Sequence, residues 1–359
     1  LLRETFLQEG HHLECDTNGD LIVSGIVYNE MKGVYSTPEA LMYKAIQENL
    51  YPETPYACDS GGDPESIPDL TYEQFRSFHR TFYSPTNARF FLTGNIPTEE
   101  HLAFLADILS GFDRVAVDSA VVSQPRWTSP RVIHGFFPID PEDRTEGKTT
   151  VNVAWMTEEN AAGETAMILS IVADLLVGNA ASPLRKALID SGLGEDLSPV
   201  TGLERDLKQI AFAVGLRGTD PDKALRIESL ILDSLRDTAA GGFERELIEG
   251  TLHQVEFHGR EMVRGSYPYG IVLMGRAYHA WLYDGDPLRD MNFPHTIRKI
   301  RRQWEDDPAL FQKVVRRWLL DNPHRLLSVM APSRILRQER ELKFRERMAR
   351  TAASLSEED

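Results

Sequence analysis

The chain has 359 residues, and its 39 Lys and Arg against 55 Asp and Glu give a net charge of −16 at pH 7. No run of 18 uncharged apolar residues occurs, so we expect no membrane-spanning helix. The acidic balance repels phosphate backbones and favours cationic partners such as basic peptides, so nucleic acid is not an expected partner. The length exceeds what one hydrophobic core usually organises, which favours two domains.

The first 50 residues are predicted to be mainly helical. Residues 1–14 are expected to form an entering helix, and Asp16 to Asp20 a turn around an Asn-Gly pair. Apolar residues recur every three or four positions between 26 and 35, which predicts a second helix. The Ser-Thr-Pro-Glu run at 36–39 is a helix-start signal, so a third helix is predicted to reach about Leu50.

Turn residues and prolines divide the middle of the chain. Residues 59–70 are predicted to be a loop, 71–83 a helix and 88–94 (ARFFLTG) a strand. The stretch from 124 to 148 contains four prolines and no periodic pattern, so we place a domain boundary there.

The second half is predicted to alternate a strand with several helices. The strand covers 149–157. The helices are expected at about 164–177, 183–190, 221–238 and 243–263.

Two segments of the chain align without gaps. Residues 75–97 match residues 311–333 at a constant offset of 236, with the predicted helix, break and strand coinciding. The match favours two related α/β units, although any amphipathic helix followed by a strand could align as well.

A search for catalytic motifs finds no nucleophile elbow, phosphate-binding loop, dinucleotide fingerprint or Cys-x-x-Cys pair. The segment His11-His12-Leu-Glu14-Cys15 resembles part of a zinc motif, but a cysteine stands where a second histidine is needed. We favour surface or packing roles for these histidines. Cys15 and Cys58 are too few for a disulfide framework, which suits a reducing compartment.

Glu30 is the carboxylate in the predicted helix at 26–35. Read from the residues alone, it is an ordinary helix glutamate paired with Lys32 or a nearby arginine. The basic stretch between His295 and Arg350, with fifteen Lys and Arg against seven Asp and Glu, is likewise read as a solvated helix face.

Four long blocks of the sequence, in order, resemble the presequence-protease branch of the insulinase/pitrilysin zinc metallopeptidases. They are GIVYNEMKGVYSTPEALMYKAIQ, TPYACDSGGDPESIPDLTYEQFRSFHRTFYSPTNARFFLTGN, LLVGNAASPLRKALIDSGLG and YPYGIVLMGRAYHAWLYDGDPL. The resemblance implies an α+β fold built from duplicated α/β roll domains. It places the family's third zinc ligand, a glutamate, on Glu30.

In that family two histidines and the catalytic glutamate of a His-x-x-Glu-His motif complete the zinc site. No such motif occurs in this sequence, so the resemblance implies that the two other ligands and the general base lie upstream of Leu1. We therefore expect no catalytic residue in this chain, zinc only in the full-length parent, and no hydrolysis by this chain alone.

The resemblance also predicts the organisation of the chain. Residues 1–130 are expected to be the C-terminal part of the first roll domain, 131–335 a second, non-catalytic roll, and 336–359 the start of a helical linker to a second half. The expected partners are short unstructured peptides and that second half, which supplies an arginine-tyrosine pair in the family. The expected location is the bacterial cytoplasm, or an organellar matrix in a eukaryote.

A second reading remains open at this point. The natural protein could be a non-catalytic peptide-binding or partner subunit of the same superfamily, without a zinc motif of its own. The coding sequence upstream of Leu1 distinguishes the two readings.

Overall fold

The computed structural model describes residues 1–261 and 268–355, and its largest unit is a mixed sheet of six strands. The strand order is β3-β8-β4-β7-β5, with β6 also paired to β7. β3 runs parallel to β8, whereas β4 is antiparallel to both β7 and β8. The bounds are β3 (Arg131–Pro138), β4 (Thr149–Glu159), β5 (Asp196–Leu197), β6 (Gly202–Glu204), β7 (Gln209–Thr219) and β8 (Arg325–Ser333).

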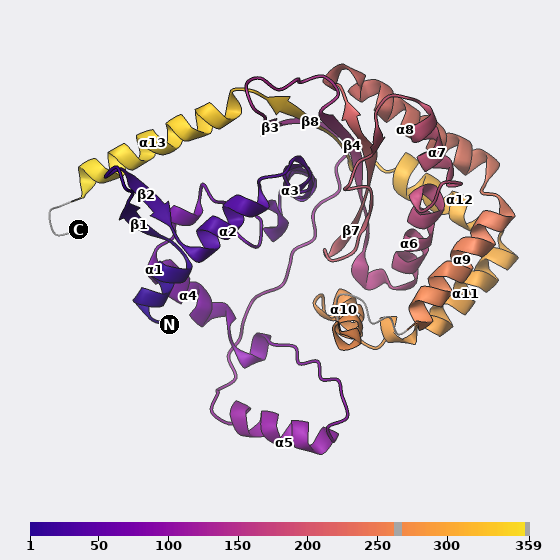
Figure 1. Cartoon of the computed structure of the whole chain (residues 1–359). Coiled ribbons are helices and arrows are strands. Elements are labelled where there is room, and N and C mark those ends of the chain that lie inside the picture. Colours follow the sequence, from indigo (N-terminus) through magenta and orange to yellow (C-terminus); the bar gives the residue numbers. More distant parts are fainter. Residues whose placement is uncertain (262–267, 356–359) are drawn as a thin grey trace.

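Helices cover one face of this sheet, on the right of Figure 1. Val151, Val153 and Trp155 of β4 point into this layer, at the period of two expected for a strand, and all three are fully buried. The helices of this region are α6 (Glu164–Val177), α7 (Pro183–Asp190), α8 (Ala224–Gly241), α9 (Arg245–Arg260), α10 (Tyr269–Trp281), α11 (Phe293–Asp306) and α12 (Leu310–Val315).

The opposite face of the sheet is covered by a helix from the N-terminal region. Helix α3 (Pro38–Leu50) buries Met42, Ile46 and Leu50 against a second core that includes Met156 of β4. Because β4 is buried from both sides, its sequence reads as a nearly continuous apolar run.

The N-terminal region contains α1 (Arg3–Glu9), a hairpin of β1 (His12–Cys15) and β2 (Leu21–Ser24), then α2 (Ile26–Val34) and α4 (Tyr72–Phe82). The prediction of one helix over 1–14 is wrong for its second part. The helix ends at Gly10, and His12 to Cys15 pair with β2 across the Asn-Gly turn, where Gly19 has φ of 85°. Strand pairing across the turn overrides the local pattern.

The predicted strand at 88–94 is also wrong, because these residues are irregular in the structure. A strand needs a partner for its backbone groups, and no strand among the described residues pairs with this segment. The aligned segment in the second half does form a strand, β8, between two partners. Helix α5 (Thr98–Leu109) follows, and none of its residues is buried. Figure 1 shows it apart from the rest of the molecule.

The stretch 124–148, predicted to be an irregular boundary, contains β3. The sequence did not reveal this strand because its pairing partner β8 lies almost 200 residues later. The predicted helices at 164–177 and 183–190 are confirmed, as is the strand from 149. The helix predicted at 221–238 is α8 after a short 3₁₀ turn. The helix predicted at 243–263 is α9, and residues 262 and 263 lie outside the described part.

A buried polar seam joins the N-terminal region to the sheet. His324, directly before β8, is fully buried and stacks on Trp127 with ring centroids 3.8 Å apart. Its Nδ1 accepts from the Trp127 backbone N–H at 3.2 Å, and its Nε2 donates to the Leu50 carbonyl at 2.9 Å. This pattern requires the neutral imidazole, which has one donor and one acceptor.

A second set of bonds continues the same seam. The Gln124 backbone N–H donates to Gln209 Oε1 at 2.6 Å, and Gln209 Nε2 donates back to the Gln124 carbonyl at 3.1 Å. The buried Tyr51 hydroxyl donates to the Gln209 carbonyl at 2.7 Å. The end of α3 and the segment before β3 are thus bonded to β7 and β8.

The seam predicts a pH dependence of stability. Burial lowers the pKa of His324 to about 4, as do the charges of Arg126 and Arg131, while the bond to Leu50 opposes this shift. The unfolded imidazole titrates near 6.5, so the unfolded state binds more protons between those values and stability falls as pH falls through this window. We expect a loss of about 2 kcal/mol in the free energy of unfolding from pH 7 to pH 5, measured by urea denaturation.

The variant His324→Gln should be less stable at pH 7 and show a flatter dependence over the same window. His253→Gln, which changes an exposed histidine of α9, serves as the matched control and should keep the wild-type slope. An unchanged slope in His324→Gln would contradict the assignment.

Candidate functional site

Helix α2 carries Glu30 on the face that points away from the protein. Tyr28 and Met31 are buried on the opposite face, against Val23 of β2. Glu30 is exposed, and its neighbours along that face, Val27 and Val34, are 37% and 46% exposed. The carboxylate therefore stands in an exposed surface whose flanking side chains are apolar.

Gly25 determines how α2 leaves the hairpin. Its φ is 151°, and a Cβ at this position would lie 2.3 Å from the carbonyl oxygen of Gly10. Only glycine allows this close approach, which also lets the Tyr28 backbone N–H donate to the Gly10 carbonyl at 3.3 Å. The glycine thereby fixes the start of the helix that presents Glu30.

The alternative reading of Glu30, an ion pair with Lys32 or an arginine, finds no support in the described residues. Within that part of the chain no ion pair includes the Glu30 carboxylate. The Lys32 ammonium instead lies over the ring of Tyr28, 5.2 Å from its centroid.

The segment His11 to Cys15 does not have the geometry of a zinc motif. His11 Nε2 donates to the Leu70 carbonyl at 2.9 Å, and His12 Nδ1 donates to the Leu7 carbonyl at 2.9 Å. His12 also lies 3.5 Å from Glu14, its neighbour on the same side of β1. A helical motif would place residues four apart on one face, whereas a strand alternates faces. These histidines satisfy backbone carbonyls of adjacent turns.

The fit of zinc to this chain can be judged from its donor groups. A catalytic zinc site takes three protein ligands. In residues 1–261 and 268–355, no three His, Cys, Asp or Glu side chains come close enough together to hold a metal ion. Cys15 and Cys58 are both exposed and unbonded. The described residues thus do not fit a complete zinc site, around Glu30 or elsewhere.

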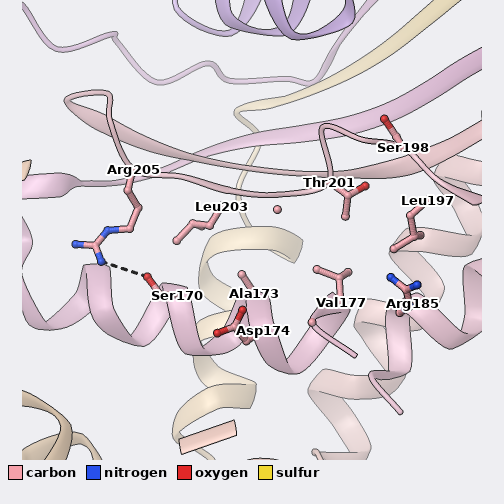
Figure 2. A pocket seen from close by; sticks show the side chains of 12 residues that line it. Ser170, Ala173, Asp174, Val177, Arg185, Leu197, Ser198, Thr201, Leu203 and Arg205 are labelled. Atoms are coloured by element: carbon pink, nitrogen blue, oxygen red, sulfur yellow. Dashed lines mark hydrogen bonds between the residues drawn. The ribbon is translucent and has the colours of Figure 1, made fainter. Parts of the chain in front are cut away.

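A cavity of about 440 Å³ lies elsewhere, between α6 and the β5–β6 edge (Figure 2). Arg205 borders it, donating from Nη1 to Ser170 Oγ at 3.4 Å and lying 3.7 Å from Asp290. Burial lowers the pKa of Arg205 and raises that of Asp174, which the charge of His258 partly offsets. These charges come from segments far apart in the sequence, so no local pattern could have revealed them.

The α+β architecture matches that of known proteins. The family model described as "Peptidase M16 inactive domain" matches residues 69–255, just over half of the chain. The chain therefore belongs to the peptidase M16 family.

The curated proteins similar to this chain include presequence proteases, as the sequence blocks predicted. The chain is 34% identical to presequence protease 1 of Arabidopsis thaliana over 99% of its length, and 32% identical to protein HypA of Clostridium perfringens over 99%. It covers 33% and 36% of those proteins, so it spans about a third of the curated relatives it matches. The chain also resembles the crystal structure of a peptidase M16 inactive domain from Pseudomonas fluorescens, with a TM-score of 0.64 and 16% sequence identity. The match covers 86% of this chain and 70% of the Pseudomonas chain.

Among the residues that the structure describes, none of the helices combines the length and apolar character needed to cross a lipid bilayer.

The donor set predicts the metal content of this chain. Because three ligands are needed and the described residues nowhere bring three together, elemental analysis of the purified chain should find far less than one zinc per molecule. The variant His11→Gln/His12→Gln should have the same content. A stoichiometric zinc that this double variant loses would show that the hairpin histidines do bind metal.

Proposed function

We propose that this chain is one part of a zinc peptidase similar to presequence proteases, whose complete form hydrolyses short unstructured peptides. The observation that carries the proposal is the 34% identity with an Arabidopsis presequence protease across 99% of the chain. Zinc bound in the complete enzyme would polarise the peptide carbonyl and activate a water molecule.

Glu30 is the residue of this chain to which we assign a role at the metal. Val27 and Val34, which flank the Glu30 carboxylate, are exposed. If another part of the protein buried this surface, the charge of Glu30 would cost free energy unless a cation paired with it. An exposed apolar surface of this kind marks a face that another part of a larger protein covers. A third zinc ligand presented from its own helix satisfies both conditions.

The remaining residues would serve architecture and substrate binding. We assign residues 1–130 to the end of the first roll domain, 131–335 to a second, non-catalytic roll, and 336–359 to a helical linker, of which 356–359 lie outside the described residues. With one metal ligand and no general base, this chain alone is expected to be inactive. The second half of the polypeptide would enclose a substrate chamber together with this chain.

The acidic charge of −16 suits basic, unfolded peptides as substrates. Such peptides would bind by adding a strand to a sheet edge, and β3 and β5 both lie at edges of the six-stranded sheet. The relatives named for mitochondria and chloroplasts favour an organellar matrix if the source is eukaryotic. For a bacterial source we propose the cytoplasm.

A second candidate function is a non-catalytic subunit that binds peptides or a peptidase partner. The description of the matched family model as an inactive domain favours it. The coding sequence upstream of Leu1 separates the two, because only a peptidase requires His-x-x-Glu-His there.

The role of Glu30 is tested in the full-length polypeptide by Glu30→Gln. This change keeps the size of the side chain but removes the charge that binds the metal, so zinc content and cleavage of a fluorogenic peptide should fall together, the latter by at least about 100-fold. Glu39→Gln, at an exposed position of α3, is the matched control and should retain both. A Glu30→Gln enzyme with a full complement of zinc would refute the ligand assignment.

A further inference from the structure

A second concave site lies on the far side of α2 from Glu30. It has a volume of about 560 Å³ and is enclosed by α2, α3, the loop at 63–68 and α13 (Leu336–Ser354). In Figure 1, α13 extends from the sheet to the hairpin of β1 and β2, so it spans both regions of the protein. We call this site the α13 groove.

The α13 groove carries the opposite charge to the rest of the protein. Three carboxylates line it, Asp63, Glu65 and Glu341. The cations that line it are twice as numerous: Lys32, Lys44, Arg337, Arg340, Lys343 and Arg347. In a chain with a net charge of −16, this local excess of positive charge is assembled by the fold, because the cations come from three separate segments.

Three of these cations already form contacts within the protein. Arg347 donates to the Glu65 carbonyl and to Asp69, both at 2.7 Å, which ties α13 to the loop. Lys44 pairs with Asp63, and its ammonium also lies 4.3 Å from the centroid of the Tyr35 ring.

Arg337, the third of them, pairs with Asp140 at 2.6 Å.

The other three cations are available to a ligand. Lys32, Arg340 and Lys343 form no ion pair with a carboxylate among the described residues, and all three are exposed. Lys32 comes from α2 and the other two from α13, so they face the groove from two walls.

The floor of the groove is apolar and strengthens charge interactions above it. Phe344 of α13 packs against a buried cluster that includes Tyr28 and Met348. Burial raises the pKa of the Tyr28 hydroxyl, consistent with a locally low dielectric. Charges held over such a floor interact more strongly than charges surrounded by water.

We propose that the α13 groove is a binding site for a small polyanion that carries a diphosphate group. Arg340 and Lys343 would hold one phosphate from α13 and Lys32 the other from α2, so the ligand would bridge the two walls. A volume of about 560 Å³ admits a small molecule, and the acidic surface beyond the groove disfavours a long nucleic acid. This proposal does not depend on the function proposed above.

The test is isothermal titration calorimetry of the 359-residue chain with inorganic pyrophosphate at constant ionic strength. We expect saturable binding at one site per chain, and weaker binding of sulfate, which has a single tetrahedral centre. A parallel titration with ADP distinguishes the source of the diphosphate: tighter binding of ADP assigns the site to a nucleotide, and tighter binding of pyrophosphate to the inorganic ion.

Two double variants with equal changes in charge localise the site. Arg340→Gln/Lys343→Gln removes two groove cations and should weaken pyrophosphate binding by at least about tenfold, since hydrogen bonds between charged groups are stronger than those between neutral groups. Arg302→Gln/Arg350→Gln removes two exposed cations that do not line the groove and form no ion pair among the described residues, and binding should change less than about twofold.

Absence of saturable binding, or equal weakening by both double variants, would overturn the proposal, because the attraction would then be non-specific. Helical circular dichroism verifies that α13 is retained in each variant. If the groove variant fails to fold, Lys32→Gln on α2 provides the same test from the other wall.

Discussion

The neutral imidazole of His324 is the contact on which the arrangement of the two regions depends. It accepts from the backbone before β3 and donates to the carbonyl that ends α3, so one buried ring holds both segments against β8. The N-terminal region needs this anchor, because among the described residues its own sheet is only the two-stranded hairpin of β1 and β2. A two-stranded hairpin is marginal by itself, and α3 gains its stability by burying Met42 and Leu50 on the larger sheet.

Helix α2 divides its surface between three environments. Tyr28 and Met31 anchor it in the apolar cluster with α13, Glu30 stands among exposed valines, and Lys32 reaches the α13 groove. The anchored face makes the other two rigid, because a helix fixes side chains three and four residues apart relative to one another. A short helix can thus support the proposed metal-ligand position on one side and the proposed anion contact on the other.

The N-terminal region and the segment that contains α5 expose several large apolar side chains. The chain covers about a third of the presequence proteases it resembles, and α5 exposes Phe104 at 66% and Leu102 at 60%. Such surface is normally covered in a folded domain. The six-stranded sheet, by contrast, has helices packed on one face over a contiguous core.

The sequence alone predicted the family and the helices α2, α3, α4 and α6 to α9, because helix signals are local, but it missed α5, α10 and α11. Proline and threonine at the start of α3, for example, act within one turn, and the Thr37 hydroxyl does accept from the Ala40 backbone N–H. The assignment of Glu30 came from resemblance, since nothing around one glutamate specifies a metal. Only the tertiary structure decided β1, β3 and the irregular course of 88–94, because a strand exists only where a partner accepts its backbone hydrogen bonds. It alone also brought Lys32, Arg340 and Lys343 together, since residues about 300 positions apart have no shared local pattern and meet only through the packing of α13 on α2.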